Sequence, residues 1–444
     1  MTTEADSISP AWRDAIAEAV RPHYRGQIVG LSGVLLEAEG VPVALGELCR
    51  IERGRNGSID AEVVGFRGSR ALLMAHGELD GIAPGQRVLA LGRSFHVAVG
   101  DELLGRVLDG FGRPLDGRPA PACNHRRSVR SPAPGPMERP SINQPFVTGV
   151  RAIDGLCTLG KGQRLGIFAG SGVGKSTLLG QVARGSSADV VVIAMVGERG
   201  REVRDFLDDV LGDEGKARCA AFVATSDRPP IERFLAPFVA VTAAEHFRDQ
   251  GLDVLLVMDS VTRFAAASRE IGLAAGEPPT VRGYPPSFFA TVPKLVERMG
   301  RTARGSITGL ITVLLDGDDP NEPVADTLRG LLDGHLMLSR DLAHRGHFPA
   351  IDTLASLSRL MPAVSSPEHR ALAQAVREDL AVWREGRDLV EIGAYKSGTN
   401  PALDEALVRV PLYQAVLRQT SHEVSSLDDT LGMFAAAAME GRQP

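Results

Sequence analysis

The chain has 444 residues, of which 43% are hydrophobic and 23% are charged, so its composition excludes a disordered or fibrous protein and its length predicts several domains. The formal net charge of -6 gives no overall electrostatic case for binding nucleic acid, which draws on clustered Lys and Arg, although a local basic pore stays open. No apolar run approaches the roughly 18 residues that span a bilayer, and no signal peptide begins the chain. The protein is therefore expected in the cytosol.

The first part of the chain combines a short amphipathic segment, a strand-rich region and a linker. Within residues 1–24, the segment WRDAIAEAV has apolar side chains at helical spacing, which predicts a helix that packs on its own protein or docks on a partner or membrane. Residues 25–95 alternate short apolar runs such as RALLMA with Gly-containing turns, which is typical of a small β-barrel. Residues 96–145 are predicted to be a linker, because Pro, which lacks an amide donor, becomes frequent after Gly117.

The second part of the chain changes from strand–helix alternation to helices alone. In residues 146–366, apolar runs such as ADVVVIAMVG and LDVLLVMD alternate with helical stretches, which indicates βαβ units around a parallel sheet. Residues 367–444 contain periodic segments such as HRALAQAVREDLAVW, which predict a C-terminal helical domain.

A glycine-rich turn joins a predicted strand to a predicted helix in RLGIFAGSGVGKSTLL. Its glycines let backbone amides approach phosphate oxygens, and the helix start adds a favourable dipole. Lys175 would reach the β- and γ-phosphates, and the Ser176 hydroxyl would ligate magnesium. Ala169 replaces the first glycine of G-x-x-x-x-G-K-[ST], a mild departure at a position that mainly shapes the turn. The predicted ATP-binding residues of this P-loop are Ala169, Gly170, Ser171, Gly172, Val173, Gly174, Lys175, Ser176 and Thr177.

Two further strands end in charged residues that suit an ATPase. Asp259 ends the run VLLVMD and is the expected partner of the magnesium ion. Glu198 and Arg199 follow VVVIAMVG in GERGREV, where the carboxylate could orient the attacking water and the guanidinium could offset charge on the γ-phosphate. Arg263 is expected either to brace these carboxylates or the phosphates, or to form a structural ion pair.

Over nearly its whole length the chain resembles the ATPases of flagellar and type III protein export, which are relatives of the rotary ATP synthase catalytic subunits. The resemblance rests on TGVRAIDGLCTLGKGQRLGIFAGSGVGKSTLL, GERGREVRDF, MDSVTRFA, REIGLAAGEPPTVRGYPPSFF, DGDDPNEPVAD and GHFPAIDTLASLSRLMP. It implies an α/β fold with a RecA-like P-loop core and parallel sheet, an N-terminal small β-barrel and a C-terminal helical domain. It also implies a homohexamer that binds ATP and Mg²⁺.

The resemblance assigns roles to individual residues. Glu198 matches the catalytic glutamate, and Arg359 in LASLSRLMP matches the arginine finger that enters the neighbouring subunit's site. Tyr395 resembles a position near the adenine, where an aromatic face could stack on the base, although a core tyrosine is an equal alternative. Residues 271–286 align with a pore-side loop, with a plain connecting loop as the alternative.

The same resemblance implies partners and a setting. It implies as partners export substrates and their chaperones, and the stalk, stator and membrane gate proteins of an export apparatus. The ATPase would strip the chaperones from the substrates and unfold the substrates. It places the chain in the cytoplasm, peripherally at the inner face of the cytoplasmic membrane, and predicts no nucleic-acid partner. The tail SLDDTLGMF favours a flagellar over a virulence-type system, while cargo and chaperones stay open.

Three other functions share parts of this pattern. A catalytic subunit of a rotary proton-translocating ATP synthase has the same barrel and helical end, but FAGSGVGKS and YPPSFF favour export. An RNA-translocating hexameric ATPase would expose aromatics for base stacking, and the barrel region contains only Phe66 and Phe95. A regulatory subunit that binds nucleotide without hydrolysis is disfavoured because Glu198 is present.

Overall fold

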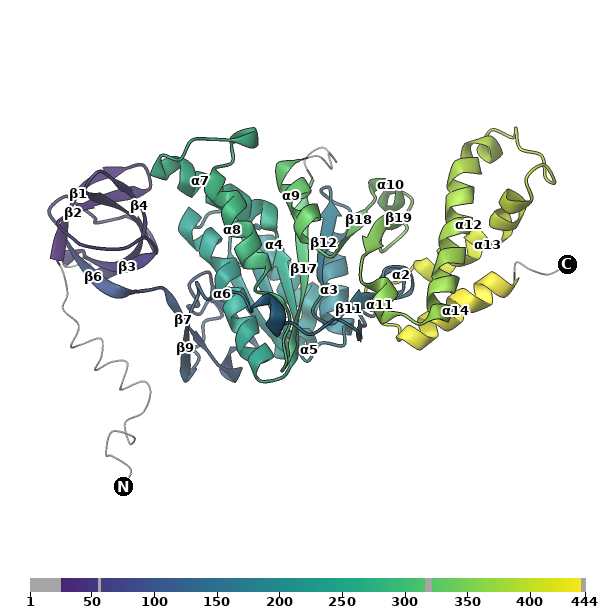
Figure 1. Cartoon of the computed structure of the whole chain (residues 1–444), viewed down its shortest axis with the longest axis horizontal. Coiled ribbons are helices and arrows are strands. Elements are labelled where there is room, and N and C mark those ends of the chain that lie inside the picture. The colour runs from purple at the N-terminus through teal and green to yellow at the C-terminus, as the bar shows by residue number, and fades with distance from the viewer. Residues whose placement is uncertain (1–24, 55–56, 316–321, 441–444) are drawn as a thin grey trace, which may run out of the picture.

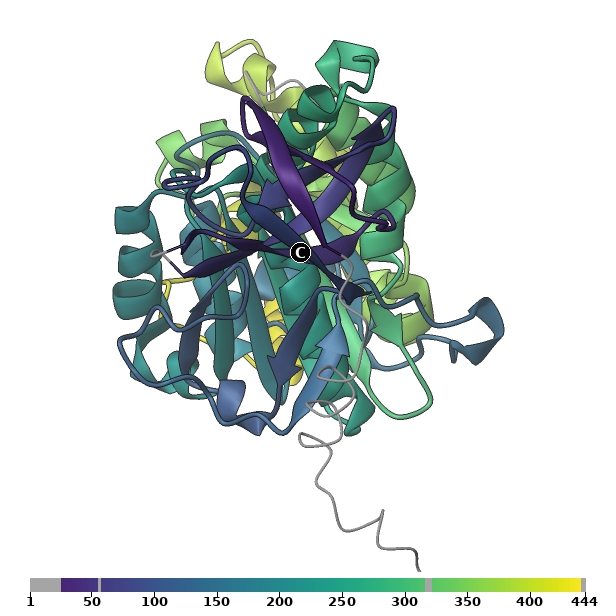
Figure 2. The same cartoon turned by 90° about the vertical axis from the view of Figure 1, so that its left-hand side faces the viewer.

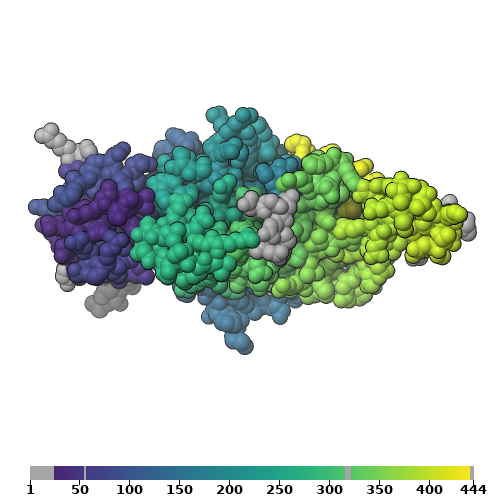
Figure 3. Space-filling model, turned by 90° about the horizontal axis from the view of Figure 1, so that it is seen from above, coloured from purple at the N-terminus to yellow at the C-terminus, as the bar shows by residue number. Residues whose placement is uncertain are grey.

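Three parts follow one another along the long axis of the computed structural model, which describes residues 25–54, 57–315 and 322–440. A small barrel occupies one end, a helix-covered sheet lies in the middle, and a helical domain forms the other end (Figure 1). The space-filling view shows the same row of parts (Figure 3). The amphipathic helix predicted within residues 1–24 lies outside the described residues.

The barrel closes six strands in the order β1-β2-β5-β4-β3-β6. One face of each strand points into the barrel, and Ile28, Leu36, Ile51 and Val63 are among the residues that fill it. The strands are β1 (Arg25–Ser32), β2 (Leu35–Glu39), β3 (Glu47–Glu52), β4 (Ser58–Arg67), β5 (Arg70–Ala75) and β6 (Arg87–Ser94). Figure 2 shows the barrel in front of the central sheet.

The segment predicted as a linker, residues 96–145, contributes a strand to the central sheet. The strand β8 (Arg106–Asp109) pairs in parallel with β14 at the edge of that sheet. A run as short as RVLD cannot be told from a loop by periodicity, so its pairing is decided only in the fold. The remaining elements of this segment are β7 (His96–Val99), η3 (Asp101–Leu103), β9 (His125–Ser128), η4 (Pro136–Glu138) and β10 (Pro145–Phe146).

The central sheet has the order β19-β18-β12-β17-β15-β13-β14-β8, and β16 pairs with β17 off this path. All pairs from β18 to β8 are parallel, whereas β19 and β16 are antiparallel to their neighbours. Its other strands are β12 (Arg164–Ala169), β13 (Val190–Val196), β14 (Cys219–Ala224), β15 (Asp253–Asp259), β16 (Gly300–Arg301), β17 (Ser306–Leu314), β18 (Gly334–Leu338) and β19 (Ile351–Ser358). A short strand β11 (Leu159–Gly160) pairs with β10 outside this sheet.

Helices cover both faces of the sheet, so its strands are apolar on both sides. Alternate residues of β13 belong to two separate cores, one shared with α6 and the other with α3. The helices of this part are α2 (Arg151–Leu156), α3 (Lys175–Gly185), α4 (Gly200–Asp205), η5 (Phe206–Leu211), α5 (Gly212–Ala217), α6 (Pro230–Asp249), α7 (Val261–Ala275), η6 (Val281–Gly283), α8 (Pro286–Val296), α9 (Pro323–Leu331) and α10 (Arg340–His344).

The C-terminal part is helical, and a serine caps the start of its longest helix, α12. The Ser366 hydroxyl accepts a hydrogen bond from the His369 amide, which satisfies a free donor at the start of α12. The helices here are α11 (Met361–Val364), α12 (Pro367–Glu391), α13 (Pro401–Leu417) and α14 (Leu427–Glu440). Within the described ranges, no helix combines the length and the apolar character that crossing a bilayer requires.

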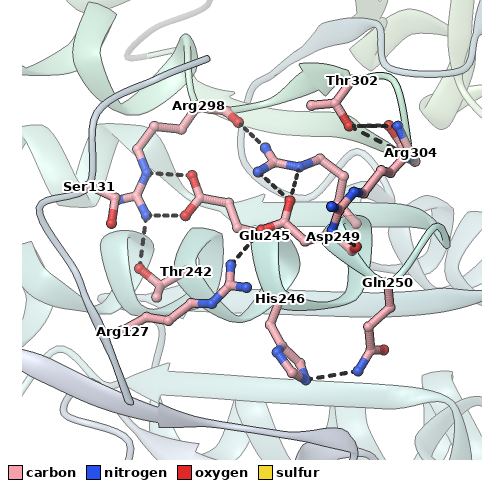
Figure 4. Close-up of polar contacts among 12 residues, drawn as sticks. Arg127, Ser131, Thr242, Glu245, His246, Asp249, Gln250, Arg298, Thr302 and Arg304 are labelled. Carbon is pink, nitrogen blue, oxygen red and sulfur yellow. Dashed lines mark hydrogen bonds and ion pairs between the residues drawn. The ribbon is translucent and has the colours of Figure 1, made fainter. Parts of the chain in front are cut away.

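A buried ion pair joins α6 to the segment after α8 (Figure 4). The Arg298 guanidinium donates to both carboxylate oxygens of Glu245, at 2.9 and 2.6 Å, and to the Thr242 hydroxyl at 2.9 Å. It also donates to the Val129 carbonyl at 2.5 Å. Because Val129 lies in the Pro-rich segment, this one side chain fastens that segment to the core.

Candidate nucleotide site

The P-loop connects β12 in the middle of the sheet to the start of α3. Gly172 and Gly174 have φ angles of 79° and 87°, which favour glycine over residues with a Cβ atom. At Gly174 a Cβ would also lie 3.3 Å from the Phe348 ring. The turn leads directly into α3 at Lys175, and no side chain caps the start of this helix, which suits a helix start that binds an anion through its first amides.

The Lys175 ammonium lies between two carboxylates at the ends of neighbouring parallel strands. It contacts Asp259 Oδ1 at the end of β15, and its Nζ lies 3.4 Å from Glu198 Oε1, which follows β13. Met195 pairs with Asp259 in the register of the two strands. The structure thus brings together three residues that are far apart in the sequence.

Burial and charge set the protonation of this cluster. Burial raises the pKa of the Glu198 carboxyl, and the Asp259 carboxylate adds to that rise while the Lys175 ammonium opposes it. Burial by itself lowers the pKa of Lys175, but the attraction of Asp259 and Glu198 outweighs it and raises the pKa. With both carboxylates ionised, two negative charges face one positive charge, which favours an added cation.

The remaining P-loop side chains divide between the core and solvent. Val173 is buried, whereas Ser171, Ser176 and Thr177 are exposed at the turn and the first turn of α3. The Ser176 hydroxyl therefore stands where an incoming ligand can reach it.

Two arginines predicted near the γ-phosphate have different surroundings. The Arg199 side chain is 83% exposed, and its Nε lies 3.9 Å from Glu202 Oε1 rather than beside the lysine cluster. Arg263 is exposed, and its stem packs on Gly197: a Cβ on Gly197, whose φ is 71°, would lie 2.7 Å from Arg263 Cβ. Arg263 thus supports the residue that immediately precedes Glu198.

Arg359 lies apart from the lysine cluster of its own chain. It follows β19, it is exposed, and its Nη2 donates to the Arg329 carbonyl at 3.3 Å. The structure of one chain therefore does not bring Arg359 together with Lys175, Glu198 and Asp259.

A cavity of about 530 Å³ lies beside the start of α3. Phe348 stands in its wall, 45% exposed, and its carbonyl accepts a hydrogen bond of 2.9 Å from the Gln419 amide. The cavity is lined by Gly174, Thr177, Leu178, Gln181, Gly346, Phe348, Pro349, Arg418, Gln419, Thr420, Ser421 and Glu423. Its volume and mixed apolar and polar wall suit the base and sugar of a nucleotide.

The aromatic residue beside the P-loop is Phe348, not the predicted Tyr395. The Tyr395 hydroxyl bonds at the start of α13, where Asp404 Oδ1 lies at 2.8 Å and the Asn400 carbonyl at 3.0 Å, and Tyr395 does not line the cavity. The sequence signal for Phe348 is the motif GHFPAID, which carried part of the family resemblance but did not indicate that its aromatic ring meets the P-loop.

Family models match all three parts of the chain. The models described as the nucleotide-binding domain and the beta-barrel domain of the ATP synthase alpha/beta family match residues 149–358 and 28–92, and the EscN ATPase C-terminal domain of type III secretion matches residues 365–436. A type 3 secretion system ATPase of Xanthomonas euvesicatoria is 50% identical over 96% of both chains. A flagellum-specific ATP synthase of Bacillus subtilis is 49% identical over 93% of this chain and 94% of that protein. The chain belongs to the flagellar and type III secretion ATPases.

Solved structures of this ATPase family have the same fold. The assembled ATPase EscN of enteropathogenic E. coli type III secretion has a TM-score of 0.88 at 44% identity, over 93% of this chain and all of that one. EscN in complex with its central stalk EscO has a TM-score of 0.86 at 43% identity, again over 93% of this chain and 100% of that one. The predicted fold class, family and enzyme class are therefore confirmed. Flagellar and virulence-type relatives match almost equally, so the flagellar preference stays a prediction.

Proposed function

We propose that this chain hydrolyses ATP to energise protein export through a flagellar or virulence-type secretion apparatus. Family membership establishes an ATPase with a nucleotide-binding domain. The observation that carries the proposal is the meeting of Lys175, Glu198 and Asp259 at the edge of the sheet where the P-loop opens.

Residues at this edge divide the work of phosphoryl transfer. The P-loop amides and Lys175 hold the phosphates, and Lys175 exchanges its carboxylate partners for phosphate oxygens. Glu198 orients the attacking water and accepts its proton, a role for which a raised pKa is suited. Phe348 offers a ring face to the base. Arg199, at the exposed rim, offsets γ-phosphate charge, and Arg263 braces the Glu198 segment.

The donor set fits magnesium. The site offers one strand-end carboxylate beside an exposed serine hydroxyl, and Mg²⁺ is typically held by one or two carboxylates together with phosphates and water. Asp259 and the Ser176 hydroxyl would hold it. Bound there, it would neutralise charge on the β- and γ-phosphates.

An arginine from a neighbouring copy completes the site. Arg359 is exposed and lies apart from its own lysine cluster, which supports a role in the next subunit, where a guanidinium would stabilise charge that builds on the transferred phosphoryl group. Similarity to the assembled EscN structure supports a homohexamer. The ring is proposed to place residues 271–286, which run from the end of α7 to the start of α8, at its pore.

The remaining partners follow from the same family. The EscN complex with its central stalk EscO supports a stalk partner for this chain. Export substrates with their chaperones, a stator and a membrane gate complete the proposed machinery, and the chain would act in the cytoplasm at the inner face of the membrane. Release of chaperones and unfolding of substrates are the proposed work of each ATP cycle.

A mixing experiment tests the shared site. ATP turnover is measured against protein concentration for the wild type, Glu198→Gln and Arg359→Ala, with Arg304→Ala as a control for loss of an exposed arginine away from the site. Each of the two site variants should be inactive alone, and Glu198→Gln protein should restore turnover to Arg359→Ala by supplying an intact finger. Normal turnover by Arg359→Ala, independent of concentration, would contradict the shared site.

A test in cells separates hydrolysis from its use. Glu198→Gln should abolish secretion of export substrates while the protein is still made at wild-type level. Secretion that continues without hydrolysis would overturn the export part of the proposal and leave the ATPase part intact.

A further inference from the structure

The strand β17 carries two threonines within a mostly apolar run, SITGLITVL. Both Thr308 and Thr312 are 0% exposed, and a buried hydroxyl normally has a hydrogen-bond partner. The two side chains lie four residues apart and therefore on the same face of the strand. Their partners differ, and that difference separates a structural hydroxyl from one that serves the nucleotide site.

The Thr308 hydroxyl forms its hydrogen bond far from the P-loop. Its hydroxyl oxygen accepts a hydrogen bond of 2.9 Å from the Gly162 amide, in the turn that leads into β12. This bond ties a turn to a strand and touches none of the residues at the P-loop.

Thr312 reaches the nucleotide site. Its Oγ1 lies 2.7 Å from Asp259 Oδ1 and 3.2 Å from the Met258 carbonyl. A hydroxyl has one proton to donate, and the shorter contact, to a charged acceptor, is the stronger of the two. Thr312 therefore donates to the carboxylate that the proposed function assigns to magnesium.

The bond orients the Asp259 carboxylate. Within the described ranges, both side-chain contacts of Asp259, from Thr312 and from Lys175, end on Oδ1. The Oδ2 atom would then be the oxygen that Asp259 could offer to a metal ion. If Lys175 moves to the phosphates of a bound nucleotide, as the proposed function has it, the bond from Thr312 would remain on Oδ1.

We infer that Thr312 is a positioning residue for the magnesium site, acting through Asp259. This inference rests on the proposed role of Asp259. Partners that orient a metal ligand commonly change metal affinity or activity by about 10–100-fold when they are removed. Sequence patterns do not indicate this residue, because a threonine in a buried strand is also a common structural choice.

The test compares Thr312→Val, which removes the hydroxyl at nearly constant shape, with Thr312→Ser, which keeps it. Thr308→Val is the matched control, since it removes an equally buried hydroxyl from the same strand. ADP affinity is measured by calorimetry with Mg²⁺ and with EDTA. The factor by which Mg²⁺ lowers the dissociation constant of ADP is called the Mg²⁺ share of ADP affinity. ATP turnover is measured on the same proteins, at one protein concentration, for kcat and KM.

The inference predicts a specific pattern. Thr312→Val should reduce the Mg²⁺ share of ADP affinity by about 10-fold, with a matching loss in kcat and little change in the ADP affinity in EDTA. Thr312→Ser should behave as the wild type. Thr308→Val should lower the melting temperature as Thr312→Val does, yet keep the wild-type Mg²⁺ share and kcat.

A purely structural hydroxyl gives a different result. If Thr312→Val keeps the wild-type Mg²⁺ share and kcat, or changes them no more than Thr308→Val does, the inference is overturned. Should Thr312→Val not fold, Thr312→Ala decides between the same outcomes. The variant Asp259→Asn distinguishes failure of the proposed function from failure of this inference. If Asp259→Asn keeps the wild-type Mg²⁺ share, the proposed role of Asp259 is wrong. If Asp259→Asn loses the Mg²⁺ share while Thr312→Val keeps it, only the inference on Thr312 is overturned.

Discussion

Removing the Arg298 side chain should cost more stability than removing its whole ion pair. Arg298 has a side chain that is 2% exposed, and it donates to Glu245, Thr242 and the Val129 carbonyl. Arg298→Met fills similar volume but leaves the Glu245 carboxylate buried without its cation, and breaking a buried pair in this way costs about 3–5 kcal/mol. At about 2–4 °C per kcal/mol for a domain of this size, the melting temperature should fall by on the order of 10 °C.

The double variant tests the reasoning. Combining Glu245→Leu with Arg298→Met removes both charges and leaves the Val129 carbonyl without its Arg298 donor, a loss of about 1–3 kcal/mol if that group stays unsatisfied. The Thr242 hydroxyl keeps its hydrogen bond of 2.8 Å to the Phe238 carbonyl. Thermal unfolding, followed by circular dichroism, should therefore show the double variant to be more stable than Arg298→Met alone. A single variant within about 1 kcal/mol of the wild type, or a double variant less stable than the single, would refute the account.

Three further predictions concern Phe348, Tyr395 and the dependence of stability on pH. Phe348→Ala should raise KM for ATP by about 10-fold, since base stacking contributes about 1–3 kcal/mol, and a steady-state assay showing unchanged KM would exclude stacking. Tyr395→Phe should leave KM for ATP unchanged, because its hydroxyl bonds Asp404 in the first turn of α13 and not a residue of the nucleotide site; a raised KM would show that Tyr395 belongs to the site. Burial lowers the pKa of His76 from 6.5 to about 3. As the pH falls, His76 is therefore protonated in the unfolded chain at a higher pH than in the folded chain. The free energy of unfolding should therefore fall, by up to about 1.4 kcal/mol per pH unit, as pH drops below 6.5. Urea unfolding should show this slope in the wild type and a shallower one in His76→Phe, and equal slopes would contradict it.

Much of the fold was predictable because its signals are local. Long apolar runs alternating with helical stretches indicate a parallel sheet covered on both faces, and that sheet is present. The strand β8 (Arg106–Asp109) escaped prediction because four residues carry too little periodicity, and only pairing with β14 decides its place.

In the candidate site, too, some residues were predictable from local sequence and others were not. The P-loop is a run of neighbouring residues whose own backbone makes the turn, so the sequence by itself determined it, down to the glycines at positions 172 and 174. Glu198 and Asp259 were also predictable, because the carboxyl ends of parallel strands meet at one edge of a sheet. Which aromatic stands beside the P-loop, and which hydroxyl holds Asp259, could be decided only by the tertiary structure. Phe348 and Thr312 reach the site through packing between segments more than 50 residues apart. A local sequence pattern cannot predict contacts between residues so far apart in the chain.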